Sequence, residues 1–301
     1  CVTVRWRAAD RIISTVSETY ARDILTPEHG QRLDPVLRDR RDRLYGILNG
    51  IDTELYDPAT DPHIAAHFDA ESLAPRAENK AALQAEFGLP VRPDLPLIGV
   101  VSRLTDQKGL DLIQAVVDPL LQHMGCQLVV MGTGELRHHE MLNGLASRRP
   151  QQVGVQLTFS RPLEQRIYAG CDVFLMPSRF EPCGLNQMVA MRYGAVPVVH
   201  ATGGLVDTVQ DYDATTRAGN GFSFERYDAM ALFAALVRAL ETYRHREVWQ
   251  QLIRRNMAAD FSWARSAEKY VDLYDRALAA RRQAMLPLRD YGLDAPDVNV
   301  G

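Results

Sequence analysis

Several features that would point to a particular class of protein are missing from this sequence. Its 301 residues include only four cysteines and no CxxC pair, which argues against a zinc or disulfide framework and favours a reducing, cytoplasmic setting. No apolar run approaches a membrane span, and we expect no signal peptide. The formal net charge of -4 argues against general binding to nucleic acid or to an anionic membrane, so phosphate recognition has to be local.

Familiar catalytic signatures are missing as well. The sequence contains no GxSxG, HExxH or Walker motif and no internal repeat. A nicotinamide-dependent oxidoreductase is the least favoured enzyme class, because no GxGxxG follows a strand with an acidic residue about 20 positions later. The adjacent His138 and His139 are expected on a solvated helix face rather than in a metal site.

The sequence does contain a regular alternation of apolar runs and helical patterns after Pro90. Several runs are continuous rather than alternating, as in strands buried on both faces. The pattern predicts an α/β fold built on a doubly wound parallel sheet. Its expected strands are residues 97–101, 127–131, 155–159, 173–176 and 196–199. Residues 229–280 have helical periodicity, with one interruption at 260–263.

Cationic side chains follow the first of these strands. Arg103 and Lys108 flank a Thr-Asp-Gln turn that ends at Gly109. Arginine has a planar fork that matches phosphate oxygens, and lysine adds a mobile charge. Ligands of open parallel sheets bind beyond the carboxyl ends of the strands, so this pair is a candidate anion site. Two exposed loop cations are the alternative that the pair alone leaves open.

A single carboxylate follows another predicted strand. Glu181 comes four residues after Pro177 and just before a Pro-Cys-Gly turn and a predicted helix. An ion pair with Arg179 is the structural alternative for this glutamate. Together with the two cations, Glu181 predicts a pocket for an anionic, polyhydroxylated ligand.

Two glycine-containing segments also follow predicted strands. Thr202, Gly203 and Gly204 combine a hydroxyl with flexible backbone before a helix, which suggests a cradle for a terminal phosphate. A flexible loop is the alternative. The segment 132–134, Gly-Thr-Gly, is weak evidence for a nucleotide, and a plain tight turn explains it equally well.

In combination, these segments resemble bacterial glycogen synthases and plant starch synthases. The resemblance spans roughly residues 9–278 and implies a GT-B fold, in which two Rossmann-like domains face each other across a cleft. It implies retaining transfer of glucose from ADP-glucose to the 4-hydroxyl at the non-reducing end of an α-1,4-glucan such as glycogen, without a metal or other cofactor. The matching segments are 48–52, 102–109, 178–185, 202–205 and 260–263.

The resemblance also implies roles for individual residues. Arg103 and Lys108 would hold the diphosphate and stabilise the departing ADP. Glu181 would contact the glucose hydroxyls and favour an oxocarbenium-like transition state. The other implied substrate-binding positions are Phe159 for adenine stacking, Gly184 and Leu185 as backbone donors, Thr202, Gly203 and Gly204 at the distal phosphate, Asn49 on the hinge side, and Cys183 and Asn186 beside them.

The domains expected from this resemblance follow the chain. Residues 1–50 would end an acceptor-side domain, 51–90 form a linker region and 91–260 bind the nucleotide sugar. Residues 261–285 would form a helix returning to the first domain, and 286–301 a tail.

The sequence departs from the family pattern in two respects. It has no Lys-x-Gly-Gly-Leu loop and no catalytic-side histidine, and Asn186 replaces a common Thr. We therefore expect a truncated form that retains the donor-binding half and transfers little glucose alone. The alternatives are a non-catalytic nucleotide- or glucan-binding remnant, or a related GT-B transferase with another nucleotide sugar.

Overall fold

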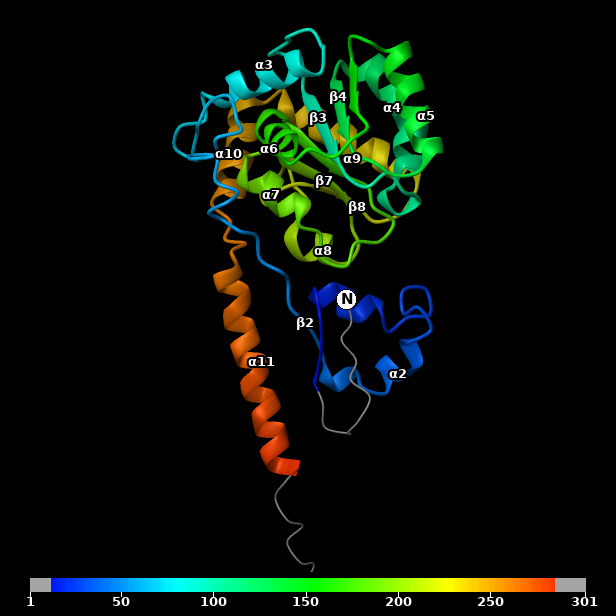
Figure 1. Cartoon of the computed structure of the whole chain (residues 1–301), viewed down its shortest axis with the longest axis vertical. Coiled ribbons are helices and arrows are strands. Elements are labelled where there is room, and N and C mark those ends of the chain that lie inside the picture. Colours follow the sequence, from blue (N-terminus) through cyan, green and yellow to red (C-terminus); the bar gives the residue numbers. More distant parts are fainter. Residues whose placement is uncertain (1–11, 285–301) are drawn as a thin grey trace, which may run out of the picture.

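A parallel six-stranded sheet forms the core of the larger part of the computed structural model, which describes residues 12–284 (Figure 1). The strand order is β5-β4-β3-β6-β7-β8, so the direction of strand addition reverses between β3 and β6. This order confirms the predicted doubly wound α/β fold. The strands are β3 (Leu97–Val101), β4 (Gln127–Met131), β5 (Val153–Gln156), β6 (Val173–Met176), β7 (Val196–His200) and β8 (Phe222–Phe224).

Helices cover both faces of this sheet. On one face α4 (Leu110–Met124) packs against α9 (Ala229–Tyr243), and on the other α3 (Arg76–Glu86) packs on α6 (Arg161–Gly170), which contacts α7 (Asn186–Arg192). Every residue of β3, β4, β6 and β7 is buried, which explains their continuous apolar sequences. The remaining helices of this part are α5 (Leu136–Arg148), α8 (Gly204–Thr208) and α10 (Arg246–Met257).

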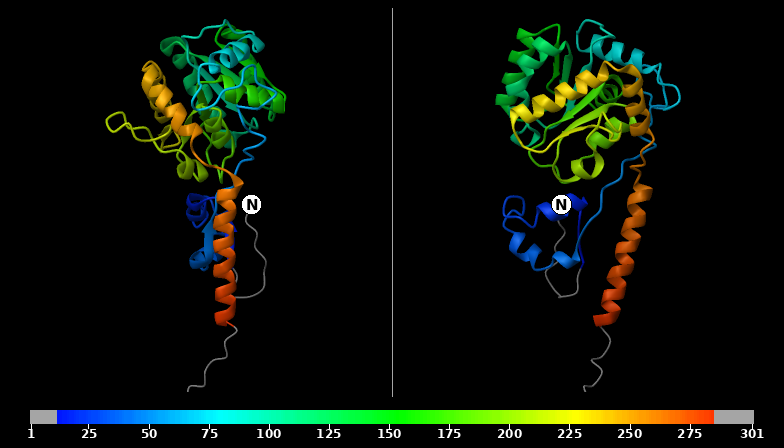
Figure 2. Two further views of the ribbon diagram at one scale, coloured as in Figure 1. Left: turned by 90° about the vertical axis from the view of Figure 1, so that its left-hand side faces the viewer. Right: turned by 180° about the vertical axis from the view of Figure 1, so that it is seen from behind.

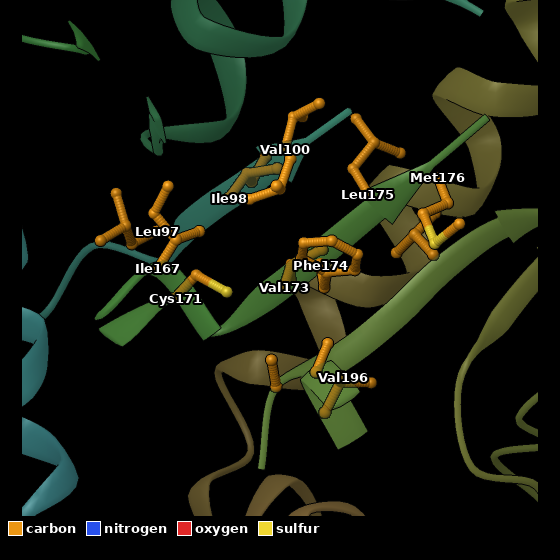
Figure 3. Close-up of a cluster of buried hydrophobic side chains, with 14 of the residues drawn as sticks. Leu97, Ile98, Val100, Ile167, Cys171, Val173, Phe174, Leu175, Met176 and Val196 are labelled. Atoms are coloured by element: carbon orange, nitrogen blue, oxygen red, sulfur yellow. The ribbon is translucent and has the colours of Figure 1, made fainter. Parts of the chain in front are cut away.

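The core between β3 and β6 is tightly packed. Phe174 and Leu97 are fully buried, and Ile167 of α6 approaches so closely that a Cβ added to Gly99 would lie 2.9 Å from its Cγ2 atom (Figure 3). The two strands that carry the candidate site therefore form a rigid support.

Three details of the strand and helix predictions are wrong. The fifth strand covers Val153–Gln156 rather than 155–159, because its ladder with β4 ends where Met131 pairs with Gln156. Strand β8 is not among the predicted strands, because its three residues are too few to give a clear pattern. The helical region from Ala229 also breaks at Arg244, beyond which α10 packs against both α9 and α7.

A small unit precedes the main sheet. Strands β1 (Ile13–Thr15) and β2 (Leu44–Gly46) pair in parallel, beside α1 (Glu18–Asp23) and α2 (Asp34–Arg38). Its apolar cluster consists of Ile13, Ile24 and Leu37.

The last described helix, α11 (Trp263–Ala284), extends away from the sheet and runs beside this small unit (Figure 2). There Lys269 Nζ lies 3.5 Å from Glu18 Oε1. Within residues 12–284 no helix is both long enough and apolar enough to cross a membrane. The predicted tail, 286–301, lies outside the described residues.

Candidate functional site

A cavity of about 190 Å³ lies at the carboxyl ends of β3 and β6, where the strand order reverses. Arg103, Lys108 and Glu181 all line it, so the structure brings together the three residues that the sequence singled out. Ligands of open α/β sheets bind at such reversal points. Gly184, Leu185 and Asn186 line the same cavity.

The central contact of the site is an ion pair between two loops. Lys108 Nζ lies 2.5 Å from Glu181 Oε2, and Ser178 Oγ donates to the same oxygen at 3.0 Å. Glu181 is only 8% exposed, so its charge needs these partners. The carboxylate is held in a defined position at the edge of the cavity.

The alternative pairing of Glu181 with Arg179 is wrong. Arg179 Nη2 instead lies 3.3 Å from Asp111 Oδ2, and its guanidinium carbon is 4.2 Å from the centre of the Tyr227 ring. Tyr227 donates its hydroxyl to Asp111, and burial, followed by this hydrogen bond, raises the tyrosine pKa. In the loop after β6, Arg179 thus contacts Asp111 and Tyr227 away from the cavity, whereas Glu181 lines the cavity.

Backbone contacts fix the two loops against each other. The Arg179 N–H donates to Gln107 O at 2.8 Å, and Gln107 Nε2 donates to Phe180 O at 3.1 Å. Gly109 has a φ of 74°, and a Cβ there would lie 2.0 Å from Pro177 O. Only glycine permits this approach together with a left-handed backbone.

Arg103 differs from Lys108 in having no acidic partner in the described part of the chain. It is exposed, and the one hydrogen bond of its side chain within residues 12–284 is a 3.4 Å contact from Nη2 to Gln107 Oε1. The cavity therefore has one guanidinium whose charge no carboxylate of the described chain neutralises. Such a group suits a phosphate oxygen.

The segment after Glu181 gives the cavity its backbone wall. Gly184 has a φ of 69°, and Asn186 Nδ2 donates to Val101 O at 3.1 Å, which ties α7 to the end of β3. Cys183 is buried, and burial raises its thiol pKa to about 11, with the Asn49 backbone N–H acting in the opposite direction. Asn49 thus lies against Cys183, and this thiol is not a nucleophile at neutral pH.

Thr202, Gly203 and Gly204 lie behind the site loop rather than along the cavity. A Cβ at Gly203 would lie 2.1 Å from Glu181 O, and the Gly204 N–H donates to that oxygen at 3.0 Å. The Gly203 N–H donates to the carboxylate of Asp23 at 3.2 Å. The backbone donors expected to bind a distal phosphate are therefore already engaged in this conformation.

Two other predicted positions lie apart from the cavity. Phe159 is 60% exposed, lies three residues beyond the end of β5 and is not among the lining residues. The glycines of segment 132–134 allow close backbone approach instead, because a Cβ at Gly132 would lie 2.0 Å from Ser102 O. For this segment, a tight turn explains the glycines, and a nucleotide site is not needed.

The expectation of two solvated histidines is wrong for His138. Its side chain is buried, and Nε2 lies 3.3 Å from Asp106 Oδ1. Asp106, Glu135 and His138 offer ligand atoms within 4.8 Å of one another, the one such group among residues 12–284. Arg137 Nη2, however, lies 2.6 Å from both carboxylates and already balances their charge.

Comparison with known proteins identifies the family. The model for glycosyl transferases group 1 matches residues 84–255, which include the whole cavity. The chain belongs to this family.

Relatives of this glycosyltransferase chain include glycogen synthases. That of Moorella thermoacetica is 52% identical over 275 residues, covering 91% of this chain and 56% of the relative. That of Gloeobacter violaceus is 51% identical, covering 89% and 58%. The chain thus spans about half the length of the curated relatives that it matches.

Solved structures agree with the GT-B fold. The catalytic domain of starch synthase IV from Arabidopsis thaliana, bound to ADP and acarbose, has a TM-score of 0.84 and 39% identity, with 89% of this chain and 56% of that chain covered. A sucrose-phosphate synthase from Thermosynechococcus elongatus, at 22% identity and a TM-score of 0.58, covering 89% and 58%, shares the fold.

Sequence reasoning missed the contribution of the small amino-terminal unit to this glycosyltransferase site. Ser17 Oγ donates to Pro182 O at 2.6 Å, and Asp207 accepts from both the N–H and the hydroxyl of Thr19. Ser17 also caps α1 by accepting from the Tyr20 N–H. Serine is a common helix cap, so the role of Ser17 at the start of α1 could be predicted. Its contact with Pro182 could not, because the two residues are 165 positions apart and no local sequence pattern indicates it.

Proposed function

We propose that this chain provides the donor site of a glycogen or starch synthase, a retaining glucosyltransferase. The reaction transfers glucose from ADP-glucose to the 4-hydroxyl at the non-reducing end of an α-1,4-glucan. The observation that supports it best is the meeting of Arg103, Lys108 and Glu181 in one cavity at the sheet reversal point. The 52% identity to a glycogen synthase and the 39% identity to a starch synthase bound to ADP favour this substrate class.

The charges that develop during the reaction explain the separate roles proposed for Arg103, Lys108 and Glu181. The bond that breaks joins the sugar C1 to a diphosphate oxygen, so negative charge grows on the diphosphate while positive charge develops on the sugar. Arg103 and Lys108 would stabilise the negative charge on the diphosphate, and the Glu181 carboxylate would stabilise the positive charge on the sugar. Losing one preorganised partner of this kind costs about 3–4 kcal/mol of transition-state stabilisation.

The remaining candidate positions would shape the donor site. Gly184 and Leu185 would present backbone to the sugar diphosphate, and Thr202, Gly203 and Gly204 would support the loop that carries Glu181. Asn49, Cys183 and Asn186 would hold this wall in place, since each contacts it or belongs to it. The domain boundaries proposed from the sequence place this site within residues 91–260.

Phe159 would bind the adenine from outside the cavity. Phe159 lies three residues beyond β5, and β5 is two positions from β3 in the sheet, about 10 Å away at about 4.8 Å per strand spacing. The exposed Phe159 ring would be available to stack on an adenine that extends from the bound diphosphate toward this edge of the sheet. A Phe159→Ala variant should weaken ADP binding and leave inorganic diphosphate binding unchanged.

Calorimetry with nucleotides and a transfer assay test this function together. We expect the chain to bind ADP in preference to UDP and GDP, and any transfer of labelled glucose to glycogen to require ADP-glucose and to fall at least about 100-fold in Glu181→Gln. Preference for UDP would instead indicate another transferase of the same fold. ADP binding unaffected by both Arg103→Gln and Lys108→Gln would contradict the proposed site.

A further inference from the structure

A second and larger cavity, of about 570 Å³, lies at the opposite ends of the same strands. Its lining residue Lys80 donates to Leu95 O, just before β3, and its lining residue Asp172 immediately precedes β6. The cavity is therefore at the amino ends of β3 and β6, between α3 and α10. None of its lining residues belongs to the candidate active site.

The side chains around this cavity carry an excess of positive charge. Lys80 and Asp172 neutralise each other, because Nζ lies 2.7 Å from the carboxylate. The other charged groups in the lining are Glu71 and three arginines, Arg76, Arg246 and Arg254. The cavity thus has two more positive than negative charges, in a chain whose formal net charge is -4. Such a local excess favours a dianion.

Two buried donors in the lining have no acceptor among residues 12–284. They are Nε of Arg76, a residue only 8% exposed, and Nε1 of Trp249, which is 3% exposed. Among residues 12–284 the Arg76 side chain makes one hydrogen bond, from Nη2 to Cys171 O at 2.7 Å, and its guanidinium carbon lies 5.8 Å from the centre of the Phe68 ring. The neighbouring Asp172 forms its ion pair with Lys80. A buried guanidinium without its own counter-ion is costly, so an anion in the cavity would stabilise it.

One face of α10 supplies the rest of the lining. Arg246, Trp249, Gln250, Ile253 and Arg254 recur at the spacing of a single helix face. Both Arg246 and Arg254 are exposed, and Arg246 Nη1 lies 3.4 Å from the hydroxyl of Tyr243, another lining residue. Helix α10 thus contributes two guanidinium groups to the cavity, and Arg76 of α3 contributes the third.

We propose that this cavity is a second ligand site, which binds a small phosphate-bearing molecule through Arg76, Arg246 and Arg254. Three guanidinium groups with a surplus of two charges match a phosphate dianion better than a single carboxylate. The volume lies within the range of small-molecule sites. The shared chemistry is the phosphate group, either as inorganic phosphate or as the ester of a small alcohol.

Thermal unfolding of the whole chain with added ligand tests this site. Inorganic phosphate should raise the melting temperature above that in potassium chloride of equal ionic strength, and ribose 5-phosphate serves as the ester probe. The double variant R246Q/R254Q should weaken phosphate binding at least about tenfold. R244Q, an exposed arginine just outside the lining, is the matched control and should bind as the parent does.

A Lys108→Gln variant separates this site from the candidate active site. Phosphate binding that persists in Lys108→Gln and is lost in R246Q/R254Q would support the second site, whether or not ADP binding is found at the first. Stronger binding of ribose 5-phosphate than of phosphate would indicate an ester, and equal binding the free ion. Phosphate binding that Lys108→Gln removes, or that R246Q/R254Q leaves intact, would overturn the proposal, as would no stabilisation beyond that of chloride.

Discussion

Lys108 Nζ lies 2.5 Å from Glu181 Oε2, although 73 residues separate the two in the chain. Both side chains are largely buried, with exposures of 15% and 10%. The pair connects the loop after β3 to the loop after β6. A diphosphate that enters the cavity has to share Lys108 with Glu181, so the ammonium is positioned before the ligand arrives.

This arrangement predicts different effects for the two partners. Lys108→Gln should weaken ADP binding at least about tenfold, because a charge-assisted hydrogen bond contributes about 1.5–3 kcal/mol. Glu181→Gln should change ADP affinity much less, because Lys108 stays available, and should act mainly on glucose transfer. Calorimetry of the single variants and of the double variant measures the coupling. Equal losses of ADP affinity in both single variants would contradict this division of roles.

The sequence predicted the sheet and the convergence of the central residues for one physical reason. Continuous apolar runs mark strands buried on both faces, and the carboxyl ends of parallel strands lie at one edge. Arg103 and Glu181 each follow such a run, so their placement in one cavity was predictable.

The local contacts were not predictable from the same patterns. Nothing in the sequence indicates that Glu181 pairs with Lys108 rather than Arg179, or that Asp23 takes the Gly203 N–H. These choices depend on how separate loops fold against each other. The end of β5 likewise depends on the length of its partner strand, which leaves Phe159 outside the sheet.

Gly109 should be sensitive to the smallest side chain. Its left-handed backbone alone costs about 1–2 kcal/mol for alanine, and the contact with Pro177 O at 2.0 Å adds an overpacking cost of about 1–3 kcal/mol. Gly109→Ala should therefore lower the free energy of unfolding by about 3 kcal/mol and displace Lys108.

Gly88 provides a matched control for this substitution. It also has a positive φ, 68°, but a Cβ there meets nothing within 4 Å. Gly88→Ala should lower the free energy of unfolding by only about 1 kcal/mol in urea titrations and leave ADP affinity unchanged. Equal destabilisation by both variants would mean that the close contact with Pro177 does not constrain the loop.

The contact between Asp23 and the Gly203 N–H should depend on pH. Burial raises the pKa of Asp23 above its ordinary value of 3.8 and outweighs the opposing effects of His29 and the Gly203 N–H. Because the folded state holds this proton more tightly than the unfolded state, the contribution of Asp23 to stability is largest at low pH and falls as pH rises through the folded pKa.

Asp23→Asn removes this dependence. The melting temperature of the variant minus that of the parent should therefore increase between pH 4 and pH 7, as scanning calorimetry can measure. Asp39→Asn, at an exposed position in the same unit, is the control and should show a smaller change over that range. A difference for Asp23→Asn that stays constant or decreases with pH would contradict the assigned cause.

The buried pair of Lys80 and Asp172 should contribute strongly to stability. Burial alone would lower the pKa of Lys80, but the Asp172 carboxylate and the Tyr243 hydroxyl outweigh it and raise the pKa above 10.5. This contribution is therefore present at neutral pH and is lost only as pH rises through the folded pKa. Asp172 also accepts from the Leu97 N–H at 2.9 Å, so the pair joins α3 to β3 and β6.

Asp172→Asn leaves the ammonium of Lys80 buried without a counter-ion, which should lower the free energy of unfolding at pH 7 by about 3–5 kcal/mol. Asparagine can still accept from the Leu97 N–H, so the loss reports on charge rather than on that hydrogen bond. Adding Lys80→Met should recover much of the stability, because neither charge then remains buried. Urea denaturation of the four proteins gives the coupling energy. If the loss of unfolding free energy in the double variant equals the sum of the losses in the two single variants, the two charges are not coupled. Tyr243 and the Leu95 carbonyl would then be the groups that stabilise the ammonium.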